Sequence, residues 1–381
     1  MTDDVHRFRA AHVVTAGGVL DDAVVEVRGE RVATVAANAW DERAERLGGW
    51  VVPGFVDTHV HGGGGHDYAT TDADEALAAR DFHAAHGTTT SFASLVTASV
   101  DDLCAQLDTL ADLVADGHLA GVHLEGPFLS ADQPGAHEPS LLRAPDPQAV
   151  DRLVEAGRGA LRLVTLAPEL NGGLDAVRRF VAAGVHVAVG HTMADDAMVV
   201  RALEAGADVG THVFNAMSPI HHRRPGPVPR LLTDPRVAAE LIADGFHVDA
   251  EVLRMALGAA GPDGVVLVTD AMVAAGMPDG PYALGGLQVQ VVDGQARLVG
   301  RDGAPGAIAG STLTTGRAFA LVAGMTGDLA AASRVASTNA ARHYGLDAGT
   351  LRPGGPADLC LVDDDGTLRR VMRRGRWLDA A

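Results

Sequence analysis

Eight short aliphatic segments alternate with helix-patterned, alanine-rich segments along most of the chain, and this alternation restricts the fold more than any other feature. Strands that are hydrophobic throughout and alternate with helices are typical of a parallel sheet covered on both faces. Eight of them predict a closed (β/α)8 barrel of the TIM type. Residues 73–86, 101–116 and 174–183 are among the predicted helices. The predicted strands are 51–60, 88–95, 121–124, 161–166, 185–189, 209–213, 239–242 and 265–269.

Both ends of the chain carry further segments that look like short β-strands. These segments are residues 11–15, 23–27, 31–35, 357–362 and 368–372. Because neither end is long enough to form a stable sheet alone, we expect the two ends to pair in one small β-sandwich. The predicted domains are therefore a β-sandwich built from residues 1–52 and 353–381, and a catalytic barrel built from residues 53–352.

Side chains that can bind metal ions lie at the carboxyl ends of five of the predicted strands. The active sites of such barrels form at the carboxyl ends of the strands, so these side chains should meet. Histidine nitrogen and carboxylate oxygen are ligands that zinc and similar divalent ions prefer. A single histidine there is more often a hydrogen-bonded structural residue, but a ring of six candidates favours a metal centre. The candidates are His59 and His61 at the end of the first strand, Glu125 at the third, His191 at the fifth, His212 at the sixth and Asp270 at the eighth.

The pair His59 and His61 is the most informative of these candidates. Side chains on a strand alternate between its faces, so residues two apart point the same way and both rings can bind one ion. The four glycines at 62–65 allow a backbone or a substrate to approach closely. The pair therefore predicts half of a metal site at the end of the first strand.

The composition disfavours several classes of function. A formal net charge of −19 argues against nucleic acid or an anionic membrane as a partner. The chain contains no lysine, so a Schiff base, a phosphate-loop lysine and a carbamylated lysine between two metal ions are excluded, and a bridging ligand must be a carboxylate. No apolar stretch approaches the ~20 residues of a membrane helix, and no signal peptide is visible at the N-terminus. Cys104 and Cys360 lie far apart in sequence and are expected to be free thiols, which fits a cytoplasmic location.

Several motifs resemble one group of enzymes. Residues 53–62, with the sequence PGFVDTHVHG, are similar to the first-strand motif of the amidohydrolase superfamily. More specific are HLEGPF at 123–128, GAH at 135–137, HVFNAM at 212–217 and VTDAM at 268–272. Together they resemble the N-acetylglucosamine-6-phosphate deacetylase family within that superfamily. The similarity extends to GGPADL at 354–359 and so covers nearly the whole chain.

The resemblance implies a metal-dependent hydrolase that removes the acetyl group from N-acetyl-D-glucosamine 6-phosphate, giving D-glucosamine 6-phosphate and acetate. It implies that Glu125, His191 and His212 bind a catalytic divalent ion. His59 and His61 would bind a second ion that shares Glu125. One or two ions per subunit are expected, with zinc the first choice and iron, manganese or cobalt as alternatives.

The resemblance also implies two catalytic residues. Asp270 would act as the general base for the metal-activated water and then as the acid that protonates the leaving amine. His137 would polarise the acetyl carbonyl. Metal, base and imidazole donor together supply what amide hydrolysis requires.

Residues 215–226 are the predicted phosphate-binding segment. It gathers two arginines and two histidines in an otherwise acidic chain, and arginine suits bidentate phosphate contacts. The ordinary alternative is a solvated basic turn. The resemblance implies that Asn215, Ala216 and Arg223 contact the phosphate. Arg223 comes either from the same subunit or from a neighbouring one, and the latter implies a homodimer. Arg224 departs from the family pattern, which has an acid there, and the prolines at 225, 227 and 229 stiffen the loop.

The remaining substrate contacts are also implied by the resemblance. His247 would hold sugar hydroxyls. Ala136 and the loop formed by Ile308, Ala309 and Gly310 would line the sugar pocket. The expected partner is thus a small amino-sugar phosphate.

Two other functions stay open from the sequence. A different amidohydrolase reaction, on a related amino-sugar phosphate or a cyclic amide, would use the same metal ligands. Equal rates with an unphosphorylated substrate would favour it. An inactive barrel retained as a binding protein is the second alternative, and it would stay inert after metal reconstitution. The presence of all metal-ligand candidates and of Asp270 disfavours this alternative.

Overall fold

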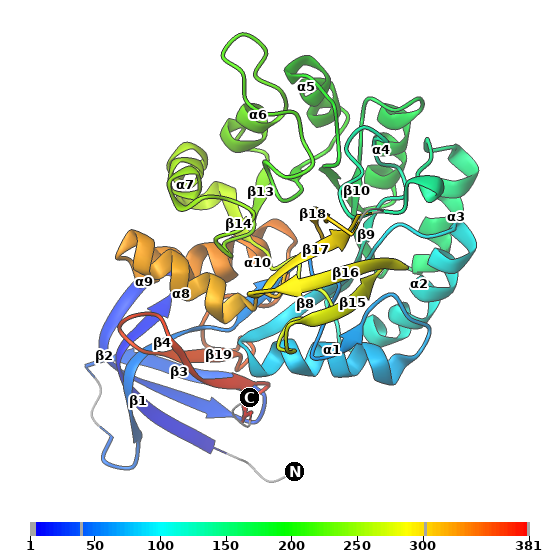
Figure 1. Ribbon diagram of the computed structural model, residues 1–381. Coiled ribbons are helices and arrows are strands. Elements are labelled where there is room, and N and C mark those ends of the chain that lie inside the picture. The colour runs from blue at the N-terminus through cyan, green and yellow to red at the C-terminus, as the bar shows by residue number, and fades with distance from the viewer. Residues whose placement is uncertain (1–4, 39–40, 301–302, 379–381) are drawn as a thin grey trace. The chain divides into compact units, whose positions relative to one another are not determined.

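The computed structural model describes residues 5–38, 41–300 and 303–378. Eight of its strands form one sheet in which the strands follow one another in chain order (Figure 1). The pairs from the second to the eighth strand are parallel. Asp270 N donates to His59 O at 2.8 Å, and His61 N donates to Ala271 O at 2.7 Å, so the segments after the first and last strands are joined. The predicted barrel is confirmed. Its strands are β5 (Phe55–Asp57), β8 (Thr88–Leu95), β9 (Gly121–Glu125), β10 (Leu161–Leu166), β11 (His186–Val189), β12 (Val209–Gly210), β13 (Ala238–Leu241) and β14 (Val265–Leu267).

A helix separates each strand from the next, as the alternating pattern predicts. The second helix shows why the sequence forms it there: the side chain of Ser99 caps its start by accepting from Asp102 N, and leucines 103, 107 and 110 bury one face. The three helices predicted by range begin and end within about one residue of the observed bounds. The helices are α1 (Ala73–Ala85), α2 (Val100–Ala115), α3 (Pro147–Gly157), α4 (Gly173–Ala182), α5 (Asp196–Glu204), α6 (Val228–Thr233), α7 (Ala250–Gly264) and α8 (Thr315–Thr326).

Among the described residues, no helix is both long enough and hydrophobic enough to cross a bilayer.

The loops and the C-terminal region contain further short elements. The short elements are β6 (Gly62–Gly63), β7 (His66–Asp67), η1 (Pro139–Leu141), α9 (Leu329–Ser333), η2 (Arg334–Thr338) and α10 (Asn339–His343).

A four-stranded antiparallel sheet, not foreseen from the sequence, is inserted between β14 and α8 (Figure 1, yellow). Two hairpin signals could have revealed it: Gly285–Gly286 and Asp293–Gly294, whose positive φ angles are those of tight two-residue turns. Its inner face packs Val289 and Val291 in one cluster with Met272, which follows β14. The inserted strands are β15 (Gly280–Leu284), β16 (Leu287–Val292), β17 (Gln295–Val299) and β18 (Pro305–Ile308).

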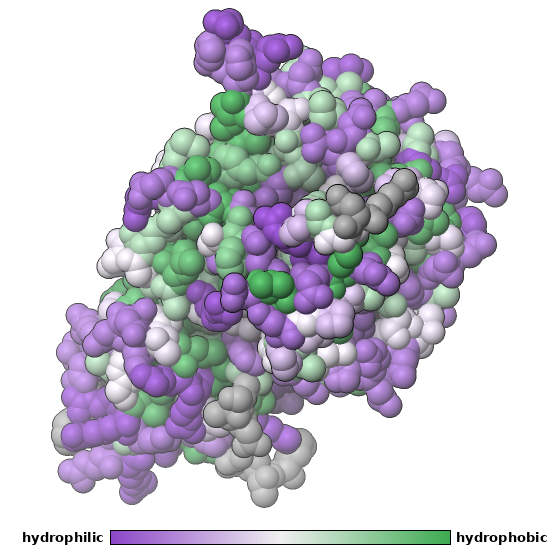
Figure 2. Space-filling model, viewed as in Figure 1, coloured by the Kyte–Doolittle hydropathy of each residue, from purple (hydrophilic) through white to green (hydrophobic). Residues whose placement is uncertain are grey.

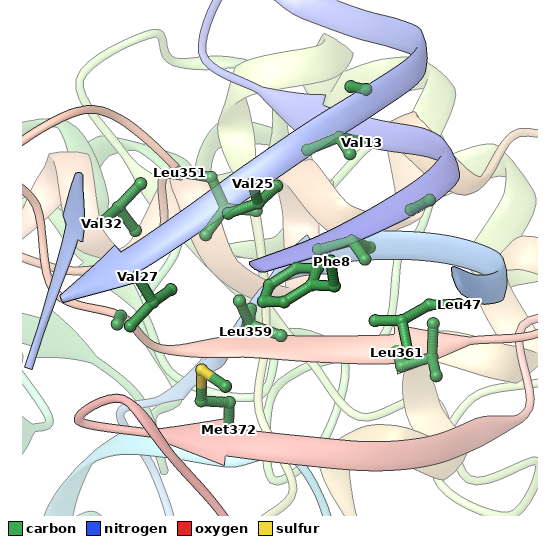
Figure 3. Packing of buried hydrophobic residues seen from close by; sticks show 14 residues of the cluster. Phe8, Val13, Val25, Val27, Val32, Leu47, Leu351, Leu359, Leu361 and Met372 are labelled. Atoms are coloured by element: carbon green, nitrogen blue, oxygen red, sulfur yellow. The ribbon is translucent and has the colours of Figure 1, made fainter. Parts of the chain in front are cut away.

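The two ends of the chain meet in a seven-stranded sheet of order β21-β20-β19-β4-β1-β2-β3. The antiparallel pairing of β4 with β19 joins the N-terminal strands to the C-terminal ones. Side chains from both groups point into one core, with Phe8 near its centre (Figure 3). The predicted small β unit from both termini is confirmed, with its layers connected as one continuous sheet. Its strands are β1 (Val5–Thr15), β2 (Gly18–Arg28), β3 (Arg31–Ala37), β4 (Glu45–Pro53), β19 (Leu359–Val362), β20 (Leu368–Arg373) and β21 (Arg376–Trp377).

The chain divides into two compact units, one of residues 1–57, 81–90 and 314–381 and the other of residues 58–80 and 91–313. The division at residues 52 and 353 stays a prediction. The ends of the predicted β-sandwich domain, 1–4 and 379–381, lie outside the described residues, as does the N-terminal stretch on which the absence of a signal peptide was predicted.

The terminal sheet should depend strongly on Phe8, which is 1% exposed and whose ring centroid lies 5.8 Å from that of Trp377. We expect Phe8→Ala to lower the free energy of unfolding by about 3–5 kcal/mol, because it removes buried area and leaves a cavity. Urea denaturation measures this change. Val19→Ala, at a 39% exposed position of the same sheet, is the matched control and should change stability by less than about 0.5 kcal/mol. Equal effects of the two substitutions would contradict the assigned core.

Candidate active site

The polar residues beyond the barrel strands point into one site because the backbone changes direction where they lie. His191 and His212 lie two residues after the ends of β11 and β12, and Asp270 lies three residues after the end of β14; their φ angles are 47°, 24° and 50°. Left-handed backbone is uncommon for residues other than glycine, and it is tolerated where the surrounding structure fixes it. These turns explain why β12 ends at Gly210, three residues before the predicted end of that strand.

The carboxylate of Glu125, the last residue of β9, lies at the centre of the site. Its Oε1 atom is 3.0 Å from His191 Nε2 and 2.9 Å from His212 Nε2. Its Oε2 atom is 3.1 Å from His61 Nε2 and 3.5 Å from His59 Nε2. All five side chains are at most 5% exposed. One buried carboxylate therefore connects four imidazoles.

Two overlapping groups of potential metal ligands result. Within each group the candidate ligand atoms lie within 4.8 Å of one another, and Glu125 belongs to both. Imidazole nitrogen and carboxylate oxygen are the donors that a zinc-like ion takes, so these residues fit one or two divalent ions with Glu125 as the shared ligand. The groups are His59, His61, Glu125 and Asp270, and Glu125, His191 and His212.

The electrostatics of the site favour cations. Burial would raise the pKa of Glu125, but the charge of His59 and the contacts with His137 and His191 hold it well below its usual value. Burial would also raise the pKa of Asp270, but the hydrogen bond with His61 and the charge of His59 lower it to about 2. Burial disfavours the charged form of His61, yet Asp270 and Glu125 raise its pKa to about 9. Both carboxylates are thus ionised at neutral pH, and a divalent ion would compete with protons on the imidazoles.

The second ring nitrogen of the ligand candidates is held by an acceptor at three of the four histidines. His61 Nδ1 lies 3.1 Å from Ser94 O, and His191 Nδ1 lies 2.9 Å from Gln133 O. His59 Nδ1 lies 3.1 Å from Oε2 of Glu240, a residue of β13. The sequence reasoning missed Glu240, although a lone carboxylate within the aliphatic run 237–243 is the kind of signal that could have drawn attention to it.

His137 enters the site from the loop between β9 and α3. Its Nε2 atom lies 3.4 Å from Glu125 Oε2, and its Nδ1 atom accepts from Thr97 N at 3.4 Å. Gly135, two residues earlier, has a φ of 54°, and a Cβ atom there would lie 2.8 Å from His191 Cε1. Only glycine fits this approach of the loop to the ligand histidine.

A pocket of about 410 Å³ opens beside the metal-ligand groups. Asn215 Nδ2 donates to His212 O, and His247 Nδ1 lies 2.7 Å from Asp244 Oδ2, so both side chains are fixed. The sequence-predicted residues that line the pocket are His61, Glu125, Ala136, His137, His191, His212, Asn215, Ala216, His247, Asp270, Ile308 and Gly310.

Three predicted site residues lie outside the lining of this pocket. His59 is fully buried behind it. Ala309 is also fully buried; its side chain packs with the inserted sheet, and its N–H donates to Ala296 O. Arg223 lines a separate hollow of about 750 Å³ together with Arg224 and Met193.

The basic loop between β12 and α6 projects beside α5 and α6 (Figure 1), and the outer end of the molecule there is hydrophilic (Figure 2). Residues 221–224 are exposed. Among the described residues, neither Arg223 nor Arg224 forms a salt bridge. The loop therefore carries uncompensated positive charge in an acidic protein.

A (β/α)8 barrel with imidazole and carboxylate ligands gathered at the carboxyl ends of its strands has the architecture of a metal-dependent hydrolase. The chain belongs to the amidohydrolase family, whose profile matches residues 50–378. The family resemblance inferred from the motifs is confirmed.

Individual relatives match over almost the whole length. An N-acetylgalactosamine-6-phosphate deacetylase of Escherichia coli O157:H7 is 36% identical over 97% of this chain and 98% of its own. The human N-acetylglucosamine-6-phosphate deacetylase is 37% identical over 92% of this chain and 87% of its own. A mutant N-acetyl-D-glucosamine-6-phosphate deacetylase of Mycobacterium smegmatis, solved in complex with N-acetyl-D-glucosamine-6-phosphate, is 45% identical, with a TM-score of 0.94 and coverage of 98% of this chain and 99% of its own.

Proposed function

We propose that this protein is a metal-dependent deacetylase that hydrolyses N-acetyl-D-glucosamine 6-phosphate to D-glucosamine 6-phosphate and acetate. The observation that carries the proposal is the buried Glu125 carboxylate, shared by four imidazoles at the wall of a pocket that Asp270 and His137 also line. The relatives support the substrate, because these similar proteins are named as deacetylases of amino-sugar 6-phosphates.

Glu125, His191 and His212 would hold the catalytic ion, and His59 and His61 would hold a second one with Glu125 in common. Zinc suits these donors first, and iron, manganese or cobalt would also be accepted by imidazole and carboxylate. When bound, the ion supplies Lewis acidity that polarises the amide carbonyl and makes water a stronger acid.

Asp270 provides the proton transfer. Its carboxylate is ionised at neutral pH, and Oδ1 lies 3.2 Å from His61 Nε2, at the wall of the pocket. It can therefore accept a proton from the attacking water and deliver it to the nitrogen of the leaving amine. His137 accepts from Thr97 N through Nδ1, so its proton is on Nε2, on the side of Glu125. That N–H would donate to the oxyanion formed from the acetyl carbonyl.

The sugar would lie against Ala136, Ile308 and Gly310, with Ala309 fixing their backbone and His247 binding hydroxyls. Asn215 and Ala216 at the pocket would contact the phosphate. Arg223 is exposed and forms no salt bridge within the part of the chain that the structure describes. It would contact the phosphate of a substrate bound to the neighbouring subunit, which implies a homodimer. We further propose a cytoplasmic enzyme whose β-sandwich comprises residues 1–52 and 353–381 and whose catalytic barrel comprises residues 53–352.

The phosphate preference tests the proposed substrate. Each charge-assisted hydrogen bond contributes about 1.5–3 kcal/mol, so kcat/KM for N-acetylglucosamine 6-phosphate should exceed that for the unphosphorylated sugar by at least about 100-fold. Arg223→Ala should lower kcat/KM only for the phosphorylated substrate, and Arg224→Ala in the same loop is the matched control. Comparable rates for both sugars would point to a different amide substrate.

Subunit mixing tests the dimer. Arg223→Ala and Asp270→Asn chains should regain activity when they are mixed, because an Asp270→Asn subunit donates its arginine to the intact catalytic centre of its partner. Absence of recovery in proven mixed dimers would place Arg223 in its own subunit or outside the site.

N-acetyl-D-galactosamine 6-phosphate is the second candidate substrate, because the E. coli relative acts on it by name and matches over 97% of this chain. The two epimers differ only in the orientation of one hydroxyl, so the ratio of their kcat/KM values decides between them. A ratio above about 10 corresponds to roughly 1.4 kcal/mol of selective transition-state binding.

A further inference from the structure

Glu240 is a buried carboxylate on β13 that has no role in the reaction described above. Its side chain is 1% exposed, and His59 beside it is 0% exposed. Oε2 lies 3.1 Å from His59 Nδ1 and 3.4 Å from His212 N, which donates to it. One oxygen thus contacts a member of each metal-ligand group.

The contact of His59 differs from those of the other ligand histidines. His61 and His191 direct Nδ1 to backbone carbonyls, which are neutral acceptors. His59 alone directs Nδ1 to a carboxylate. With the proton on Nδ1, the lone pair is on Nε2, the atom that faces Glu125 and Asp270 at 3.5 Å each. A carboxylate acceptor also makes that nitrogen a stronger donor to a metal.

The position of Glu240 is unfavourable for a residue with only a structural role. Its neighbours on β13 are the fully buried Ala239 and Leu241. Within the described residues Glu240 Oε1 has no hydrogen-bond partner. A buried carboxylate without full compensation is costly, and an imidazole that carries a bound cation would offset its charge.

We propose that Glu240 is a positioning residue that fixes His59 in the Nδ1–H tautomer and thereby promotes binding of the second divalent ion at His59 and His61. The inference rests on the metal-dependent function proposed above. It assigns Glu240 an effect on metal occupancy and no direct contact with substrate.

Metal binding measures this effect directly. Metal-stripped protein is titrated with zinc against a chromogenic chelator, and bound zinc per subunit is determined by mass spectrometry of the metal. Glu240→Gln keeps a hydrogen-bond acceptor and removes the charge, whereas Glu240→Leu removes both. We expect the site of His59 and His61 to lose about 10-fold in affinity in the first variant and about 100-fold in the second. The other site should keep its zinc.

Asp358→Asn is the matched control. Asp358 is a half-buried carboxylate, which accepts from Arg374 N at 2.6 Å, and it belongs to the other compact unit. It should leave zinc binding at both sites unchanged. If this control lost as much zinc as Glu240→Gln, the loss in both variants would be due to general destabilisation, and the proposal would be overturned.

A double-mutant cycle tests the route through His59. In a His59→Asn background, Glu240→Gln should cause no further loss of zinc affinity, because its partner is gone. An undiminished additional loss would overturn the proposal. If the Glu240 variants do not fold, nitrogen NMR of ¹⁵N-histidine-labelled wild-type protein serves instead, and a His59 ring that carries its proton on Nε2 in the zinc-loaded protein would contradict the assigned tautomer.

The wild type in the same titration separates this inference from the proposed function. Wild-type protein that binds zinc and releases acetate, with Glu240 variants that bind zinc equally well, would overturn only the role of Glu240. Wild-type protein that binds no zinc would overturn both.

Discussion

Asp270→Asn is expected to lower kcat about 1,000-fold, within the range that a positioned general acid–base contributes. Asparagine preserves the size of the side chain but cannot accept the proton of the attacking water. The wild-type carboxylate is suited to this step because the hydrogen bond with His61 and the charge of His59 outweigh its burial and lower its pKa to about 2. Its backbone N–H bonds to His59 O, so the strand ends should stay joined in the variant.

The metal content of the variant must be measured beside its rate, because Asp270 Oδ1 is also a potential metal ligand. A variant that keeps its catalytic ion at Glu125, His191 and His212 and still loses activity isolates the proton transfer. Asp132→Asn, an exposed carboxylate on the loop that carries His137, is the matched control and should keep full activity. If metal-loaded Asp270→Asn kept more than a tenth of the wild-type kcat, a different base would have to be sought.

Glu125→Gln is expected to abolish activity by removing the ligand that both metal groups share. Changes to residues that only support a ligand cost 10- to 100-fold in metal affinity, so replacing the shared ligand should cost more than about 100-fold at each site. Zinc bound to wild-type protein at 1,000 times its Kd would add about 4.1 kcal/mol of stability. The melting temperature of the wild type should therefore rise with zinc, and that of the variant should not.

Glu169→Gln provides the matched control for this substitution. Glu169 follows the neighbouring strand β10, and its carboxylate accepts from Thr192 Oγ1 at 2.5 Å and from Met193 N at 2.6 Å, outside the metal groups. This control should respond to zinc as the wild type does. Retention of two zinc ions by Glu125→Gln would rule out Glu125 as the shared ligand.

Local sequence signals were sufficient for the barrel and for the residues at its strand ends. The strand ends were predictable because a parallel barrel brings the residue that follows each strand to one face, whatever the loops do. Helix α2 was predictable because its cap and its leucine face are encoded within residues 99–115.

Features that depend on distant residues were not predictable in the same way. Glu240 is 181 positions from His59 in sequence, and only closure of the barrel brings the two together. The separation of Arg223 from the pocket depends on the path of the basic loop, which no periodic pattern specifies. The inserted sheet was not predicted although its hairpin turns carry Gly–Gly and Asp–Gly pairs, because its half-exposed strands lack the continuous hydrophobic runs of buried parallel strands.

Acetate release from N-acetylglucosamine 6-phosphate during zinc titration of metal-stripped protein tests the central claim most directly. Acetate and bound zinc are measured in the same samples. The proposed function predicts negligible release without metal, and a rate that rises with zinc and reaches a plateau when one or two ions are bound per subunit. Release that is independent of zinc, or no release from protein with both sites filled, would contradict it.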